Sequence, residues 1–233
     1  MKKIVTILMI AALLMITIPI QTLADQGSQP EVVSQSSQGT NRYLSWDLVT
    51  PQVSGLESRR AERIINKELT QTVSGFRKNL LDEAKKAYRE SMKPEYPFRP
   101  FQAQTVYQVH TLNPDLLSLT MDMYQYTGGA HGMTVRKSFN YNLKTGKMLG
   151  YQDLFKACVN YKEVIVHHVR DQIIKNPNVY FKEAMETVKD FTDEQPFYIT
   201  PKGIVVVYGL YEIAPYAAGI QEFLVPFSAF QCS

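Results

Sequence analysis

The stretch between Ser54 and Pro94 constrains the fold more than any other part of the chain. Its apolar side chains recur at steps of three and four residues, which is the period of an amphipathic α-helix. Ser54 and Glu57 fit a capping box at its start, and Pro94 is expected to end it. The pattern predicts one long helix, or two helices joined near Gly75, with a charged face toward solvent. The apolar positions are Ala61, Ile64, Ile65, Leu69, Val73, Phe76, Leu80, Ala84 and Tyr88.

Segments with a period of two residues follow this helix. From Phe101 to Val109, apolar and polar residues alternate as in a half-exposed strand. After turn residues at 113–115, the stretch Leu117 to Met123 alternates in the same way. A third strand is expected from Val135 to Leu143, closed by a hairpin turn at 144–147.

The C-terminal half adds helices in a block before more strands. Helices are expected at Tyr161 to Lys175 and at Tyr180 to Phe191. A hairpin is expected over Phe197 to Tyr208, and a last strand at Phe223 to Phe227. Strands joined by tight turns, with helices inserted in blocks, predict an α+β fold with a mainly antiparallel sheet.

Residues 1–24 have the features of a secretory signal peptide. Lys2 and Lys3 precede an apolar run from Ile4 to Ile20, and Ala24 ends a segment of small residues suited to cleavage. The alternative is an uncleaved membrane anchor, because the run approaches the ~20 residues that a spanning helix needs. The cleaved signal is the preferred interpretation, which places the protein outside the cytoplasm, secreted or at the cell surface.

The segment after the signal is polar. Residues 25–41 are rich in Gln, Ser and Gly and are expected to form a linker, followed by a first strand from Tyr43 to Val49 that ends at Pro51. Loss of the signal lowers the formal net charge of +3 by two. Because the remaining acids and bases are interspersed, neither nucleic acid nor an anionic membrane surface is an expected partner.

Cysteine and histidine give no metal-binding pattern. Cys158 and Cys232 could form a disulfide in an exported protein or remain two separate thiols, and the sequence leaves both open. No CxxC spacing is present. Adjacent histidines on the predicted helix point about 100° apart, so they do not form an i, i+4 ligand pair. We therefore expect no metal and no cofactor. The four histidines are His110, His131, His167 and His168.

The loop from Tyr124 to Gly132 combines three glycines with a histidine between two predicted strands. Such a backbone suggests positive φ angles or close approach to a ligand. It lacks the Lys-Ser or Lys-Thr of a phosphate loop, and the chain has no Gly-x-Ser-x-Gly elbow. A histidine bonded to its own turn is favoured over a catalytic one. The candidate binding residues here are Tyr124, Tyr126, Gly128, Gly129 and His131.

A second unusual loop runs from Tyr211 to Gly219. It is too apolar for an ordinary solvated connection, and its tyrosines could stack on sugars or anchor a protein interface. A loop folded onto its own core is equally consistent with the residues. The candidate binding residues are Tyr211, Glu212, Pro215 and Tyr216. An alternative catalytic set for glycan hydrolysis joins His131 with Asp122 or Glu212.

Three motifs in this order resemble the two-part extracellular module of the PdaC/RsiV-like family. They are Thr127-Gly-Gly-Ala-His-Gly132, then Phe139-Asn-Tyr-Asn-Leu-Lys-Thr-Gly-Lys147 with Asp153-Leu-Phe155, and finally Tyr211 to Ile220. The resemblance implies a bacterial envelope protein with an N-terminal part at 42–132 and a C-terminal part at 133–233. It also implies lysozyme sensing, as in RsiV-type proteins, or attachment to a separate peptidoglycan deacetylase domain, as in PdaC-type enzymes. We expect this sequence to lack both the sigma-binding and the deacetylase parts.

These observations together predict a secreted or cell-surface recognition module without enzymatic activity. The expected ligand is a muralytic protein such as lysozyme, or peptidoglycan itself. The alternative hypothesis is a cell-wall or glycan hydrolase that uses His131 with Asp122 or Glu212.

Overall fold

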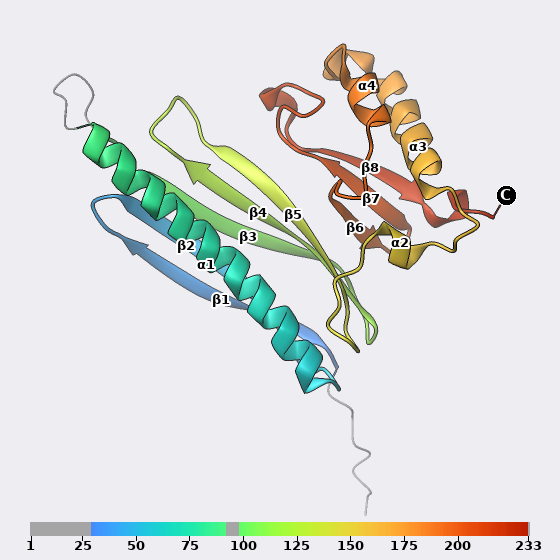
Figure 1. Cartoon of the computed structure of the whole chain (residues 1–233), viewed down its shortest axis with the longest axis horizontal. Helices are drawn as coiled ribbons and strands as arrows, with labels where there is room; N and C mark the ends of the chain where they lie inside the picture. Colours follow the sequence, from blue (N-terminus) through green and yellow to red (C-terminus); the bar gives the residue numbers. More distant parts are fainter. Residues whose placement is uncertain (1–28, 92–97, 233) are drawn as a thin grey trace, which may run out of the picture.

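The computed structural model describes residues 29–91 and 98–232, so the predicted signal peptide at 1–24 and Pro94 lie outside it. The described chain forms two sheets with helices packed on each, which confirms the predicted α+β fold (Figure 1). The first sheet has the order β1-β2-β3-β4-β5, and the second has the order β6-β7-β8. The strands are β1 Glu31–Thr40, β2 Leu44–Ser54, β3 Phe101–Leu112, β4 Leu116–Tyr126, β5 Met133–Asn142, β6 Phe197–Thr200, β7 Gly203–Tyr208 and β8 Gln221–Pro226.

The helices follow the predicted periodicity with shifted ends. The long amphipathic segment is one continuous helix. The second helix expected in the C-terminal half is shorter than predicted, because Tyr180, which follows a 3-10 turn at Pro177–Val179, has an extended backbone. The helices are α1 Arg59–Glu90, α2 Tyr151–Leu154, α3 Tyr161–Lys175 and α4 Ala184–Lys189.

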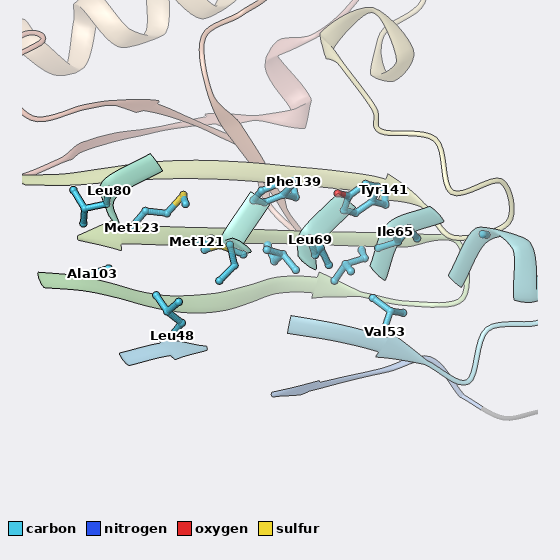
Figure 2. Close-up of a cluster of buried hydrophobic side chains, with 14 of the residues drawn as sticks. Leu48, Val53, Ile65, Leu69, Leu80, Ala103, Met121, Met123, Phe139 and Tyr141 are labelled. Carbon is cyan, nitrogen blue, oxygen red and sulfur yellow. The ribbon is translucent and has the colours of Figure 1, made fainter. Parts of the chain in front are cut away.

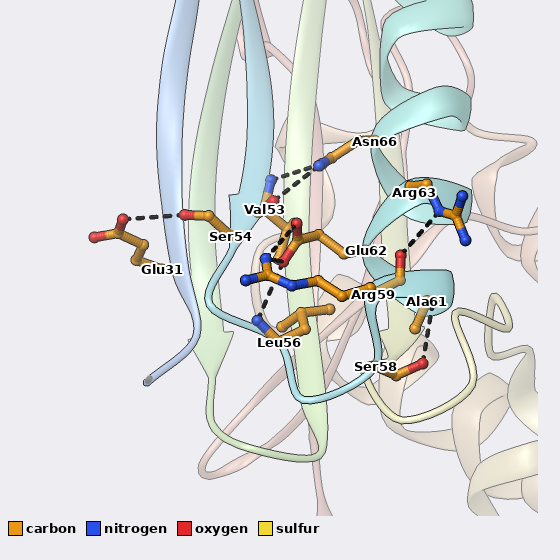
Figure 3. A network of polar contacts seen from close by, with 10 residues as sticks. All are labelled: Glu31, Val53, Ser54, Leu56, Ser58, Arg59, Ala61, Glu62, Arg63 and Asn66. Atoms are coloured by element: carbon orange, nitrogen blue, oxygen red, sulfur yellow. Dashed lines mark hydrogen bonds and ion pairs between the residues drawn. The ribbon is translucent and has the colours of Figure 1, made fainter. Parts of the chain in front are cut away.

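Helix α1 starts later than the predicted capping box. Its N-cap is Ser58, whose hydroxyl accepts a hydrogen bond from the Ala61 amide at 3.2 Å. Ser54 instead ends β2, and the chain turns at Gly55 with φ of 76° before the helix begins. Asn66 then ties the helix to β2, because its side chain accepts from Val53 N at 2.7 Å and donates to Val53 O at 2.8 Å (Figure 3).

Residues 31–40 are a strand, so the prediction of a polar linker at 25–41 was wrong for this part. Strand β1 pairs antiparallel with β2 along its whole length, and backbone bonds hold it although most of its side chains are exposed. The composition of residues 31–40 does not predict a strand, because the strand forms by pairing with the edge of β2, a different segment of the chain. The Trp46 ring lies so close over Gly39 that an added Cβ would come within 2.2 Å of it.

Strand β2 also continues through Pro51, where the sequence was expected to end it. The parallel ladder between β2 and β3 finishes at the pair Leu48 and Thr105. Because no β3 residue pairs with β2 beyond that point, the missing amide hydrogen of Pro51 removes no bond to β3.

The first hydrophobic core lies between α1 and one face of the first sheet (Figure 2). Buried side chains of the helix meet alternate residues of β2, β3, β4 and β5, as the periods of 3.6 and 2 require. Ile64, which was also expected on the apolar face, is 40% exposed. The helix contributes Ala61, Ile65, Leu69, Val73, Leu80 and Ala84 to this core.

The second sheet meets the first sheet on the face opposite α1. Ser118 of β4 accepts from the Ile199 amide of β6 at 2.7 Å, and Asn140 of β5 donates to the Phe197 carbonyl oxygen at 2.9 Å. Thr111 of β3 adds a bond to the Ile199 carbonyl oxygen at 2.8 Å. These bonds satisfy polar groups of β6 and of the first sheet where they meet, so the two sheets have a defined relative position.

The chain passes from the first hydrophobic core to a second one between Leu143 and Tyr151. Leu143 belongs to the first core, and Tyr151 begins a second core between α3, α4 and the second sheet. The predicted division between Gly132 and Met133 therefore separates two strands, β4 and β5, that pair in one sheet. Cys158 and Cys232 form a disulfide, which resolves the alternative that the sequence left open.

Candidate functional site

The two loops singled out from the sequence meet in the structure. The Tyr216 hydroxyl donates to the Gly132 carbonyl oxygen at 3.2 Å, and the Tyr216 ring lies 4.4 Å from the His131 ring between centroids. His131 is exposed and bonds through Nδ1 to the same Gly132 oxygen at 2.9 Å. Because a carbonyl oxygen only accepts, Nδ1 carries the proton. The prediction that His131 bonds to its own turn is confirmed.

Tyr211 extends this contact into a row of three rings. Its ring centroid lies 5.7 Å from that of Tyr216, and 47% of the residue is exposed. Its φ is 65°, the one positive φ among non-glycine residues that the structure describes. An aromatic residue with this backbone angle is an outlier, because its Cβ crowds the backbone there. We call the rings of His131, Tyr211 and Tyr216 the aromatic row.

Tyr124 and Tyr126 stand on β4, on the sheet face that α1 does not cover. The Tyr124 ring packs directly on Gly132, where an added Cβ would come within 2.3 Å of the ring. Arg99 lies near the Tyr126 hydroxyl, with Nη1 at 3.5 Å. The glycine at 132 thus serves close packing, which explains why the loop needs a residue without a side chain at this point.

The remaining loop residues shape the backbone. Gly128 has a φ of 90°, as the sequence suggested for this loop, and an added Cβ at Gly129 would meet nothing within 4 Å. Pro215 is exposed and precedes the short 3-10 helix Tyr216–Ala218. These residues lie in the two loops that meet.

Glu212 is engaged within its own turn. Its carboxylate accepts from the Gly209 amide at 2.6 Å and from Gln195 Nε2 at 3.0 Å. Its charge also raises the pKa of the Tyr208 phenol, after burial as the larger cause. This acid therefore fixes the base of the second loop.

Asp122 is held by Arg136 on the neighbouring strand. Arg136 donates to both carboxylate oxygens at 2.6 and 2.7 Å, and its remaining arm donates to Glu222 of β8 at 2.7 Å. The hydrogen bonds to Asp122 are the main cause that raises the pKa of Arg136, which keeps the guanidinium charged. This triad joins the two sheets. The sequence did not predict this triad, because Arg136 and Glu222 are 86 positions apart in the chain.

His110 and Tyr198 form a second contact between the sheets that the sequence did not reveal. Their rings stack at 3.7 Å between centroids, and His110 Nε2 bonds to the Thr120 hydroxyl at 2.9 Å. Burial lowers the pKa of His110, against a smaller raising effect of Glu222. Burial, followed by Glu222, raises the pKa of Tyr198 to about 12.

The three residues of the alternative catalytic set have different partners. His131 bonds to Gly132, Asp122 to Arg136, and Glu212 to Gly209 and Gln195. Within residues 29–91 and 98–232, no group of three or more His, Cys, Asp or Glu is placed to hold a metal ion. In the same ranges, no helix has the length and apolar character needed to span a membrane.

Comparisons with known proteins match both parts of the chain. The family model "Deacetylase PdaC" matches residues 37–134, and the model "Protein of unknown function (DUF3298)" matches residues 152–228. Anti-sigma-V factor RsiV of Bacillus subtilis is 28% identical over 78% of this chain and 62% of its own length. The chain is a PdaC/RsiV-like two-part module. This confirms the resemblance found in the sequence motifs.

Other relatives of the PdaC/RsiV-like module differ in length. Peptidoglycan-N-acetylmuramic acid deacetylase PdaC of Bacillus subtilis is 29% identical over 47% of this chain, which spans 26% of that enzyme. Immunogenic protein MPT64 of Mycobacterium tuberculosis is 26% identical over 64% of this chain and 65% of its own length. The chain thus spans less than two thirds of each of these relatives.

Solved structures show the same fold for the whole module. A DUF3298 family member from Bacteroides fragilis has a TM-score of 0.66 at 20% identity, covering 87% of this chain and 92% of that chain. One from Pseudomonas aeruginosa has a TM-score of 0.57 at 19% identity, covering 88% and 93%. At these identities the likeness is one of fold alone.

Proposed function

We propose that this chain is an exported recognition module of the bacterial envelope without enzymatic activity. Its ligand is a lysozyme-like muralytic protein or the peptidoglycan on which such proteins act. One relative is named for a deacetylase of peptidoglycan, and another is an anti-sigma factor. The disulfide between Cys158 and Cys232 is consistent with export, since such bonds persist in oxidising compartments.

The observation that carries this proposal is the strained and exposed Tyr211. A residue in a sparsely populated backbone region costs on the order of 1–3 kcal/mol, and such positions cluster at ligand sites. Tyr211 accepts a φ of 65° while its ring stays 47% exposed beside Tyr216. Rings held in place in this way lose little conformational entropy when they bind, which makes them good anchors.

The hydrolase alternative has less support from the geometry. A general base must reach the proton that it removes, and an orienting partner should hold it. His131 has an orienting bond from Nδ1 to a backbone oxygen, but the hydrogen-bond partners of the two candidate acids lie elsewhere: Asp122 binds Arg136, and Glu212 binds Gly209 and Gln195. Each candidate group stabilises its surroundings, and this is the role we assign to all three.

The test uses a substitution that should weaken ligand binding without lowering the stability of the fold. Tyr211→Gly relieves the backbone strain, so stability should stay equal or rise, while affinity for lysozyme or purified cell walls should fall about tenfold. Calorimetry measures binding, and urea unfolding measures stability. Phe227→Ala is the matched control, because Phe227 is 43% exposed at a distant 3-10 helix.

Two results would contradict the proposal. The purified protein could give no heat with either ligand at concentrations up to about 100 μM, corresponding to a binding free energy weaker than about −5.5 kcal/mol. Alternatively, Tyr211→Gly and Phe227→Ala could change affinity equally. Release of reducing sugar from cell walls, abolished by His131→Gln, would favour the hydrolase alternative instead.

A further inference from the structure

The face of the first sheet that α1 leaves uncovered carries a surface made of amides and phenol rings. Gln102 and Gln104 of β3 are exposed and alternate with the buried Phe101 and Ala103. Directly opposite them on β4 lie two tyrosines, in the pairs Gln102 with Tyr126 and Gln104 with Tyr124. We call this surface the amide–tyrosine strip. Its residues are Gln38, Asp47, Gln102, Gln104, Tyr124 and Tyr126.

The strip runs across the strands. Gln38 pairs with Asp47 in the β1 and β2 ladder, and Asp47 pairs with Gln104 of β3. Gln104 pairs in turn with Tyr124 of β4. Three strand intervals of about 4.8 Å give a length of roughly 14 Å. This suits an extended polymer that lies perpendicular to the strands.

The charge of the strip indicates an uncharged ligand. Its one carboxylate, Asp47, accepts from Gln38 Nε2 at 3.0 Å. At the border of the strip, Arg136 is paired with both Asp122 and Glu222, so its positive charge is fully engaged. An exposed cation, Arg99, lies near the Tyr126 hydroxyl at one end of the strip, with Nη1 at 3.5 Å. Apart from Asp47 and this end, the strip consists of amides and phenols, which offer donors and acceptors to a neutral polymer with amide groups.

The tyrosine rings are fixed before a ligand arrives. The Tyr124 ring rests on Gly132, and the Gly132 carbonyl oxygen accepts from Tyr216 of the aromatic row. The strip is therefore continuous with the aromatic row. Phenol rings offer flat apolar faces for stacking, and their hydroxyls remain able to bond at the edge.

We propose that the amide–tyrosine strip binds an uncharged, N-acetylated glycan chain, with tyrosine rings against sugar faces and glutamine amides bonded to the acetamido groups. This inference rests on the proposed function and deepens it, because it selects the glycan class of ligand and gives it a surface of its own. The aromatic row then forms one end of the glycan site.

The experiment titrates the purified protein with the β-1,4-linked hexamer of N-acetylglucosamine in a calorimeter. Saturable binding is expected, with a Kd between about 10 μM and 1 mM, which is −7 to −4 kcal/mol. The double substitution Gln102→Ala and Gln104→Ala should weaken it at least tenfold. Gln71→Ala is the matched control, since Gln71 is an exposed glutamine on α1, on the other side of the sheet. The hexamer of glucose, without acetamido groups, should bind at least tenfold more weakly.

Several outcomes would overturn the inference. The first is that the N-acetylated hexamer shows no binding at concentrations up to about 1 mM, the upper limit of the expected Kd. The second is that the double substitution and Gln71→Ala change affinity equally. The third is that both hexamers bind with equal affinity. Failure of the proposed function looks different. In that case Tyr211→Gly leaves the binding of cell walls and lysozyme unchanged, whatever the result with the hexamers.

Discussion

The Tyr216 hydroxyl donates a hydrogen bond to the carbonyl oxygen of Gly132, 84 positions earlier in the chain. This bond joins the two parts of the module at the place where the candidate loops meet. The same oxygen also accepts from His131, so the two rings and the glycine turn hold one another.

Tyr216→Phe should lower the free energy of unfolding by about 0.5–1.5 kcal/mol, because it removes one half-buried hydrogen bond and keeps the ring. Urea unfolding followed by the fluorescence of Trp46, the single tryptophan, measures the change. Tyr107→Phe is the control, since its hydroxyl bonds to Ser34 within the first sheet at 2.9 Å. An unchanged stability for Tyr216→Phe would show that the bond between the loops does not stabilise the fold.

Arg136→Lys should destabilise the protein by roughly 1–3 kcal/mol although it keeps the positive charge. An ammonium group cannot reproduce the forked contact with Asp122 and the third bond to Glu222 at once. The control is Lys78→Met, because Lys78 lies 3.4 Å from Asp82 in an exposed pair, which contributes ~0.5 kcal/mol or less. Equal losses for the two substitutions would contradict a special role for the triad.

His110 makes stability depend on pH. Its pKa in the folded protein lies below the usual 6.5, because burial against Tyr198 and Thr120 disfavours the charged ring, Glu222 opposes this, and Arg136 adds to it. The unfolded state therefore binds the proton more readily. Stability is complete above pH 6.5 and is lost as the pH falls from there through the folded pKa, by at most about 1.4 kcal/mol per pH unit.

The measurement compares the wild type with His110→Asn in urea unfolding from pH 8 to pH 5. The difference at pH 8 gives the effect of the lost packing alone. The variant should lose less stability than the wild type below pH 6.5. Parallel curves over the whole range would exclude His110 as a source of the pH dependence.

Two glycines should respond in opposite ways to alanine. Gly75 lies in the interior of α1 with no atom near an added Cβ, so Gly75→Ala should stabilise the protein by about 0.5–1 kcal/mol. At Gly132 the added carbon would displace the Tyr124 ring, so Gly132→Ala should lower both stability and ligand affinity. Thermal unfolding and calorimetry measure the pair, and a stabilised Gly132→Ala would contradict the packing role of this glycine.

Residue periodicity predicted most of the architecture. The apolar steps from Ala61 to Ala84 placed α1, and the alternation around Phe101 and Leu117 placed β3 and β4. Strand β1 was missed because its own side chains carry no pattern, and its order comes from backbone bonds to β2. Composition cannot report a partner that lies elsewhere in the chain.

The candidate site was predicted only in part. Glycines, tyrosines and a histidine marked the two loops, and the structure brings these loops into contact. The triad of Arg136 with Asp122 and Glu222 could not be predicted, because it depends on how the two sheets meet. The positive φ of Tyr211 also has no local sequence signal, since tyrosine rarely adopts that angle.

The parallel pairing of β2 with β3 has a consequence for synthesis on the ribosome. Strand β2 and the whole of α1 emerge before Phe101, the first residue of β3. Until that residue is made, β2 has β1 on one edge and an open edge on the other. A nascent or truncated chain that ends before Phe101 therefore exposes a strand edge to which a neighbouring polypeptide can add. The open edge of β2 is closed only when β3 is in place beside it.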